Sequence, residues 1–268
     1  MPANMADNPR PFVPTSIARN LLSRLALTHE ECAISVISGP WGIGKTRTLD
    51  EFYAANEATS LIVKVEPGPR GKGAAPARVL QFIAEGLQRA VDPRGCRVRL
   101  GNGYLQLRQA ICDYLSIMFD HPEGARFTFI FDEAQNLSRE AIETLRYWND
   151  ADRCTTPFPV GLFFVGNNEF AMQSDRSGES VISGAVRSRA LFIESLDYSD
   201  VSEADLVLFA ESRGIADAAV ISAIVRYYSS PKTKPDFRTL ERSISVIQRL
   251  AGSGPVTAEI LQTVLSPL

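Results

Sequence analysis

The segment GPWGIGKT, from Gly39 to Thr46, constrains the fold more than any other part of the sequence. It matches the pattern G-x-x-x-x-G-K-S/T at every fixed position, directly after the apolar residues 33–38 and before a segment with helical periodicity. In such a loop, successive backbone N–H groups point at an anion, and the following helix adds the positive end of its dipole. The pattern predicts a strand, a phosphate-binding loop and a helix. A glycine-rich turn with an exposed lysine is the simpler alternative.

The residue types in this loop predict a site for ATP. Lys45 would reach the β- and γ-phosphates, and the hydroxyl of Thr46 would coordinate Mg²⁺. Trp41 is bulky for such a loop, and its ring could shield the nucleotide or contact a neighbouring subunit. The expected nucleotide-binding residues are Gly39, Pro40, Trp41, Gly42, Ile43, Gly44, Lys45, Thr46 and Arg47.

Strand and helix patterns alternate around the loop. Residues 33–38, 60–66, 127–131 and 160–165 are short segments rich in apolar or β-branched residues, which is typical of strands covered on both faces. Helical periodicity occurs at about 15–28, 46–55, 76–90, 104–119 and 138–149. We therefore expect an α/β fold in which helices flank a parallel sheet, as in P-loop nucleotide-binding proteins.

The pattern changes beyond Asp197, where no further strand is expected. Helical segments occur at 203–213, 216–228, 237–250 and 257–264, separated by glycine or proline. We predict an α/β nucleotide-binding domain over residues 15–197 and a small all-helical lid over residues 198–268. Residues 1–14 contain four prolines, which disfavour a helix or a central strand, and are expected to form a flexible arm.

Polar residues end two of the predicted strands, where an open parallel sheet binds its ligands. Asp132 would hold Mg²⁺, and Glu133 would polarise the attacking water as a general base. Asn167 would hold that water or the γ-phosphate from the opposite side, with Asn168 as the second choice. A helix cap for the acidic pair and an asparagine-rich turn are the structural alternatives.

Three arginines further along the chain are candidates for a phosphate contact. Arg187 and Arg189 precede the apolar residues 190–193, and one of them would neutralise charge on the phosphoryl group transferred in a neighbouring subunit. Arg238, in the first turn of the predicted helix 237–250, would fold onto the phosphates of its own chain. An arginine paired with a surface carboxylate, or an exposed first-turn arginine, is the alternative.

Composition narrows the remaining function classes. The 268 residues contain four cysteines, none in a C-x-x-C pair, and two histidines, so we expect neither a zinc site nor a disulfide framework. No apolar run approaches the roughly 20 residues of a membrane helix. The first ten residues lack the apolar core of a signal peptide, and we expect a cytoplasmic protein with no membrane partner.

The formal charge of −3 hides an uneven distribution of charge. Residues 68–108 hold eight basic and two acidic residues, so they carry +6 and leave −9 for the rest of the chain. Basic side chains on glycine-flanked loops suit contacts to the phosphates of double-stranded DNA that do not read its sequence. A solvated loop that keeps the protein soluble is the alternative. The candidate DNA contacts are Arg70, Lys72, Arg94, Arg97 and Arg99.

These features occur in the order found in AAA+ ATPases, which the chain resembles over roughly residues 15–250. Within that superfamily it resembles the transposition ATPases of the MuB type and their relatives TniB and TnsC. The segments that carry this resemblance are Phe131-Asp-Glu-Ala-Gln-Asn-Leu-Ser138, Leu145-Arg, Phe164-Val-Gly-Asn167, Val186-Arg-Ser-Arg189 and Phe237-Arg-Thr-Leu240.

The resemblance implies a function. Members of that family polymerise on DNA with ATP, mark target sites, recruit and stimulate a transposase, and are reset by ATP hydrolysis, here expected to be weak and stimulated by DNA or a partner. It implies that Asn167 is the first sensor, that Arg187 or Arg189 is the finger acting between subunits, and that Arg238 is the second sensor. Lys45, Thr46, Asp132 and Glu133 would be the ATP and Mg²⁺ residues.

One departure from the family pattern concerns DNA. MuB carries an N-terminal helix-turn-helix domain, and the roughly 15 residues before the first predicted helix are too few for one, so we expect a compact form whose ATPase domain holds DNA as a ring or helical filament. Two other functions stay open. One is an AAA+ ATPase that acts on protein partners in secretion or signalling, and the other is a structural polymer gated by nucleotide.

Overall fold

The computed structural model describes residues 11–68, 73–91, 101, 103–119, 125–150, 156–170, 180–252 and 254–265. Within these residues the chain forms two compact units. The first, the sheet unit, comprises Leu21–Pro40 and Leu49–Leu196. The second, the helical unit, comprises the described residues up to Asn20, the segment Trp41–Thr48 and the residues from Asp197 onward.

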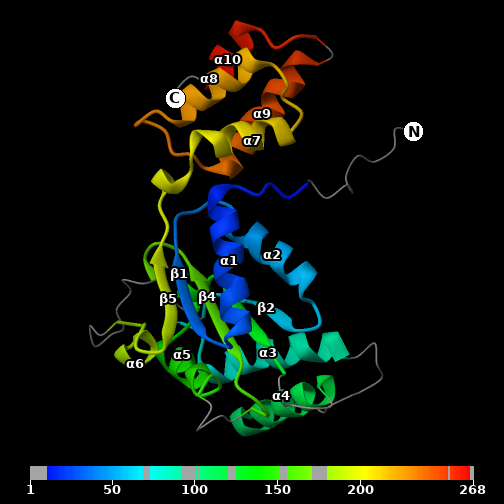
Figure 1. The fold of residues 1–268 in the computed structure, drawn as a ribbon, viewed down its shortest axis with the longest axis vertical. Coiled ribbons are helices and arrows are strands. Elements are labelled where there is room, and N and C mark those ends of the chain that lie inside the picture. Colours follow the sequence, from blue (N-terminus) through cyan, green and yellow to red (C-terminus); the bar gives the residue numbers. More distant parts are fainter. Residues whose placement is uncertain are drawn as a thin grey trace. The chain divides into compact units, whose positions relative to one another are not determined.

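In the described part of the chain, the sheet unit is built on five parallel strands in the order β2-β3-β4-β1-β5. Strands β1, β2, β4 and β5 are labelled in Figure 1. Because the strands are parallel, their carboxyl ends share one edge of the sheet. This arrangement confirms the predicted α/β fold with a parallel sheet. The strands are β1 (Ile34–Ser38), β2 (Ser60–Lys64), β3 (Thr128–Asp132), β4 (Gly161–Gly166) and β5 (Ala190–Ser195).

Burial explains which strands can be predicted from the sequence. Every residue of β1, β3 and β4 is buried, as expected for predominantly apolar strands in the middle of a parallel sheet. β5 lies at the edge and alternates between half-buried and exposed residues, with Leu191 and Ile193 exposed. The sequence pattern does not predict this fifth strand, because its apolar run is only four residues long and Glu194 follows it.

Helices α3, α4 and α5 share one apolar core with the strands, in which Phe129, Phe131 and Phe164 are buried. α5 is shorter than the predicted helix 138–149, because Ser138 is its N-cap and the helix ends at Arg146. The helices up to β5 are α1 (Ser16–Glu30), α2 (Lys45–Ala55), α3 (Pro76–Val91), α4 (Tyr104–Met118), the 3-10 helix η3 (Ala134–Asn136), α5 (Arg139–Arg146) and α6 (Gly184–Arg187).

The helical unit contains four α-helices after Asp197 in its described residues, and each begins within two residues of its predicted start. Side chains of Ser202, Asp217 and Asp236 accept hydrogen bonds from backbone N–H groups and so set the starts of α7, α8 and α9. No helix in the described ranges is long and apolar enough to cross a membrane. The bounds are η5 (Tyr198–Asp200, a 3-10 helix), α7 (Glu203–Ser212), α8 (Ala218–Tyr228), α9 (Phe237–Ala251) and α10 (Ala258–Leu265).

The described end of the predicted arm packs in the helical unit. Val13 is 8% exposed and belongs to the apolar core of α7, α8 and α9. Arg213, at the end of α7, donates a hydrogen bond from Nη1 to the carbonyl oxygen of Pro11 at 3.4 Å. The segment that makes these contacts comes directly before α1, which begins at Ser16.

Asp205 joins the start of α1 to the start of α7. Its buried carboxylate accepts hydrogen bonds from Ser16 N at 2.7 Å, Ser202 N at 2.9 Å, Ser202 Oγ at 2.8 Å and Ser16 Oγ. Burial by itself would raise the pKa of Asp205, but the hydrogen bonds from Ser16 and Ser202 outweigh it, and the pKa lies below its ordinary value of 3.8. The ionised carboxylate therefore stabilises the fold.

Asp205→Asn should lower the free energy of unfolding by about 2–4 kcal/mol, because an amide turns a donor towards groups that already donate. A folded-state pKa below the unfolded one stabilises the protein above the unfolded pKa, and that stabilisation is lost as the pH falls through the folded pKa. The difference in Tm between Asp205→Asn and the unsubstituted protein should thus be largest at pH 7 and shrink in acid below about pH 4. Thermal unfolding over a pH series measures it.

Asp217→Asn is the matched control for this prediction. Asp217 is an exposed N-cap of α8 that accepts hydrogen bonds from Ala219 N and Val220 N, and asparagine is an equally good N-cap. Its Tm should stay that of the unsubstituted protein at each pH. Equal shifts in the two variants would show that Asp205 has no special role.

Candidate functional site

The predicted phosphate loop follows β1 directly. Gly39 still pairs with the sheet, because its N–H donates to the carbonyl oxygen of Gly166 at 3.2 Å. Gly42 and Gly44 have φ values of 75° and 96°, a backbone conformation that favours glycine, and α2 begins at Lys45. The strand, glycine loop and helix predicted from the motif are therefore present.

Within the helical unit, the loop contacts the start of α9. Phe237 N donates a hydrogen bond to the carbonyl oxygen of Gly42 at 2.9 Å. A Cβ atom at Gly42 would lie 1.7 Å from Oδ1 of Asp236, so a larger residue here would displace the side chain of Asp236. Asp236 also caps α9 by accepting a hydrogen bond from Arg238 N at 2.8 Å. Arg238, the expected second sensor, is thus exposed in the helical turn that contacts the loop.

Trp41 is 67% exposed, although it lies inside the loop. The hydroxyl of Tyr198 donates a hydrogen bond to the Trp41 carbonyl oxygen at 3.1 Å. Burial, together with the negative charges of Asp236 and Asp197, raises the pKa of Tyr198, which keeps this hydroxyl a donor. The backbone of the loop is held on this side while the indole ring stays accessible.

The acidic pair lies at the carboxyl end of β3. Asp132 is 5% exposed, and its Oδ1 accepts a hydrogen bond from Glu133 N at 3.0 Å. Glu133 has φ 58° and ψ 40°, so the chain turns at this residue and the two adjacent side chains are not held to opposite faces of a strand. A carboxylate at this position is a hard oxygen ligand of the kind that Mg²⁺ prefers, so Asp132 fits the predicted metal.

Asn167 lies beside the acidic pair, because β4 is the neighbour of β3 and ends at Gly166. Adjacent strands are about 4.8 Å apart. Asn167 Oδ1 accepts a hydrogen bond from Glu169 N at 3.1 Å, which leaves its amide Nδ2 as the end that can donate to a phosphate oxygen or a water molecule. Asn168 is exposed in the same turn.

Gln135 connects these two strand ends, and sequence reasoning misses it. Its Nε2 donates to Glu133 Oε2 at 2.5 Å, and its Oε1 accepts from Asn167 N at 3.1 Å. Gln135 is part of the segment 131–138 that carries the family resemblance, but neither that resemblance nor its residue type predicts a role for it.

Arg187 and Arg189 lie at the amino ends of the strands, opposite to the end that carries the acidic pair. α6 ends at Arg187 and β5 begins at Ala190, so both arginines are at the amino end of a strand, whereas Glu133 and Asn167 are at carboxyl ends. A strand of five or six residues is roughly 15–20 Å long. The fold therefore separates these arginines from the acidic pair of their own chain.

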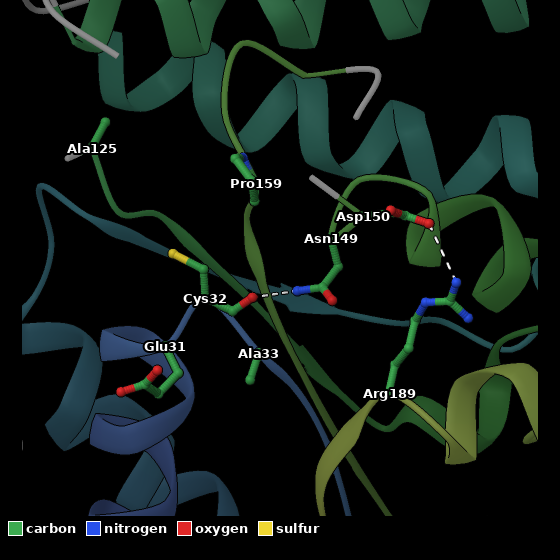
Figure 2. Close-up of a pocket in the computed structure, with 8 residues that line it drawn as sticks. All are labelled: Glu31, Cys32, Ala33, Ala125, Asn149, Asp150, Pro159 and Arg189. Carbon is green, nitrogen blue, oxygen red and sulfur yellow. Dashed lines mark hydrogen bonds and ion pairs between the residues drawn. The ribbon is translucent and has the colours of Figure 1, made fainter. Parts of the chain in front are cut away.

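The two arginines have different partners. Arg189 Nη2 forms an ion pair with Asp150 Oδ2 at 3.3 Å, and both residues line a pocket at the amino ends of the strands (Figure 2). Arg187 Nε donates to the carbonyl oxygen of Ile182 at 3.2 Å, and its Nη2 donates to Ser180 Oγ at 3.4 Å.

The start of α6 is tied to α5. The Ser183 hydroxyl caps α6 by accepting a hydrogen bond from Val186 N at 3.2 Å, and it donates to Oε1 of Glu143. Glu143 also pairs with Arg146 at 2.8 Å. Burial by itself would raise the pKa of Glu143, but its hydrogen bonds to Ser183 and Arg146 lower it. This ionised network fixes the helical turn that carries Arg187.

The predicted DNA contacts lie outside the described residues. This applies to all five of them: Arg70, Lys72, Arg94, Arg97 and Arg99.

The fold is similar to that of several solved structures. The ORC2 protein of Aeropyrum pernix in its ADP form has a TM-score of 0.60 and 17% identity, over 98% of this chain and 71% of that one. Cdc6p from Pyrobaculum aerophilum has a TM-score of 0.60 and 16% identity, over 97% and 69%. Drosophila ORC bound to DNA has a TM-score of 0.54 and 15% identity, over 98% and 63%. Because the sequence identities are this low, the similarity to these structures shows a shared fold and nothing about function.

Sequence comparison identifies the family. A search of curated proteins finds no match. The family model described as an AAA domain matches residues 28–173, which is more than half of the chain and includes the phosphate loop, the acidic pair and Asn167. The protein therefore belongs to the AAA domain family, and it is an AAA+ ATPase.

Proposed function

We propose that the protein is an ATP-dependent, DNA-binding regulator of transposition. It forms a homo-oligomer, a ring or a helical filament, on double-stranded DNA, recruits or activates a transposase, and is reset by ATP hydrolysis. The single observation that carries the ATPase part is the group formed by Asp132, Glu133 and Asn167 at the sheet edge from which the phosphate loop starts. The transposition part rests on the sequence resemblance to the MuB type.

In this proposal each residue of the site has one task. Lys45 and the backbone N–H groups of the loop bind the phosphates of ATP, and Asn167 orients the water molecule. Glu133 accepts a proton from that water, whose oxygen bonds to the γ-phosphorus while the bond from the γ-phosphorus to the β,γ-bridging oxygen breaks. ADP and inorganic phosphate leave. Thr46 and Asp132 would hold Mg²⁺, which neutralises charge on the phosphates when bound.

The position of the arginines supports an oligomer. Arg187 and Arg189 lie at the edge of the sheet opposite to Glu133, so they can assist hydrolysis only in another copy of the chain. Such a contact is heterologous, with different surfaces on its two sides, and repeats into a ring or a helical filament. A repeating assembly also multiplies the phosphate contacts that each subunit makes with DNA.

Two observations favour DNA as the partner. Residues 68–108 carry +6 in a chain whose total charge is −3. Drosophila ORC, which shares the fold at low identity, is bound to DNA in its solved structure. We propose that Arg70, Lys72, Arg94, Arg97 and Arg99 contact DNA phosphates and that binding does not depend on base sequence.

A binding titration with duplex DNA over a salt series tests this function. ATP should raise the affinity for DNA, and two duplexes of unrelated sequence should bind equally. The logarithm of the binding constant should fall with the logarithm of salt by about 0.9 per phosphate contact. Replacing Arg94, Arg97 and Arg99 by alanine should weaken binding to both duplexes equally and make the slope less steep.

Lys45→Ala supplies the control, because its DNA binding should not respond to ATP. DNA binding by the unsubstituted protein that ATP does not strengthen would contradict the proposed function. It would favour an ATPase that acts on protein partners.

A further inference from the structure

The carboxylate of Glu133 is held by a neighbouring amide. Gln135 Nε2 lies 2.5 Å from Glu133 Oε2, and Gln135 is the one hydrogen-bond partner of that carboxylate in the described part of the chain. The Glu133 backbone is fixed separately, because its N–H donates to Asp132 Oδ1 at 3.0 Å and its carbonyl oxygen accepts from Asn136 N at 2.9 Å. The amide of Gln135 therefore decides where the end of the Glu133 side chain lies.

The other end of the Gln135 amide is anchored on β4. Its Oε1 accepts a hydrogen bond from Asn167 N at 3.1 Å, across 32 residues of sequence. A backbone N–H can only donate, so the amide oxygen must face Asn167 and the NH₂ group must face Glu133. Glutamine satisfies both neighbours at once. A glutamate would repel Glu133, and an apolar residue of the same size would bind neither.

The backbone at Glu133 makes such an anchor necessary. Its left-handed conformation is uncommon for a residue with a side chain. The glutamate side chain has three rotatable bonds and is only half-buried, so without a partner it would occupy several rotamers. A general base has to stay within hydrogen-bond reach of the water that it activates.

We propose that Gln135 is a positioning residue for ATP hydrolysis. It ties the carboxylate of Glu133 to the carboxyl end of β4 and so keeps the general base at a fixed separation from Asn167. This inference rests on the hydrolytic role of Glu133 under the proposed function. Gln135 contacts neither ATP nor water in this account, and it acts through Glu133.

Two substitutions separate positioning from packing. Gln135→Met keeps the volume and removes both hydrogen bonds. Gln135→Glu keeps the shape and the acceptor for Asn167 N, but it turns an oxygen towards Glu133. Both variants should lower kcat by about 10- to 100-fold, the cost of a misplaced catalytic group, while KM for ATP and the binding of ATP stay unchanged. A residue that only fills space would tolerate Gln135→Glu.

A double-substitution cycle with Glu133→Gln shows whether Gln135 acts through Glu133. In the Glu133→Gln background, Gln135→Met should cause no further loss, because the base that it positions is already absent. An equal fall in both backgrounds would overturn the inference. Gln109→Met is the matched control, since Gln109 Nε2 donates to a carboxylate oxygen of Asp113 at 2.8 Å on exposed residues of α4, and its kcat should be unchanged.

The outcome also distinguishes the inference from the function on which it rests. Absence of ATP hydrolysis by the unsubstituted protein would overturn both. Hydrolysis that Gln135→Met and Gln135→Glu leave at the original rate would overturn the role of Gln135 alone.

Discussion

Glu133→Gln should lower the rate of ATP hydrolysis by about 10²- to 10⁴-fold, the range of a general base, and leave the affinity for ATP unchanged. The amide has the size of the carboxylate but cannot accept the proton of the attacking water. Steady-state phosphate release measures the rate. On DNA the same variant should remain bound after ATP is added, because hydrolysis is the step that resets the proposed regulator.

Tryptophan fluorescence can measure ATP binding in this variant. Trp41 lies in the phosphate loop and is 67% exposed, whereas Trp148, the second of the two tryptophans, is 1% exposed. A change of emission on adding ATP should therefore come from Trp41 and be absent in Trp41→Phe. Lys45→Ala should lose both the change of emission and hydrolysis.

Two outcomes would contradict this account. If Glu133→Gln hydrolyses ATP as fast as the unsubstituted protein, Glu133 is not the base. If it loses hydrolysis and assembles on DNA as before, yet also dissociates from DNA as before, hydrolysis does not reset the assembly. The protein would then be better described as a structural polymer gated by nucleotide binding.

The central part of the sheet can be predicted from the sequence because burial on both faces leaves a strong signal. Residues 127–131 and 160–165 are almost entirely apolar, and β3 and β4 form there. β5 has no such signal, because an edge strand with one open face can alternate or carry a charge such as Glu194. Its position next to β1 depends on the topology of the whole sheet.

The candidate site divides in a similar way. The loop and the acidic pair are contiguous motifs, and their residue types and order are sufficient to predict them. Gln135 is not predictable, because its importance comes from a hydrogen bond to Asn167, a residue far away in the sequence. The separation of Arg187 from Glu133 is not predictable either, since it depends on β5 being a strand that runs parallel to the others.

The contacts of Arg187 and Arg189 distinguish between the two arginines, which the sequence alone does not. Asp150 already neutralises Arg189 at 3.3 Å, and Arg187 lies on a helical turn whose start is fixed by Ser183 and Glu143. We therefore favour Arg187 as the finger that acts between subunits. Arg187→Ala should lower ATP hydrolysis by about 10³-fold, and Arg189→Ala should lower it far less. Neither substitution should change the affinity for ATP.

Mixing two inactive variants tests whether Arg187 acts in another copy of the chain. Arg187→Ala binds ATP without a finger, and Lys45→Ala keeps the finger without binding ATP. In a random equal mixture about one quarter of the heterologous interfaces combine an intact site with an intact finger, so about a quarter of the original activity should return. The matched control replaces Lys45→Ala with the double variant Lys45→Ala/Arg187→Ala, which brings neither part and should restore nothing. Activity that stays absent in the first mixture, although both variants still assemble, would contradict a finger that acts between subunits.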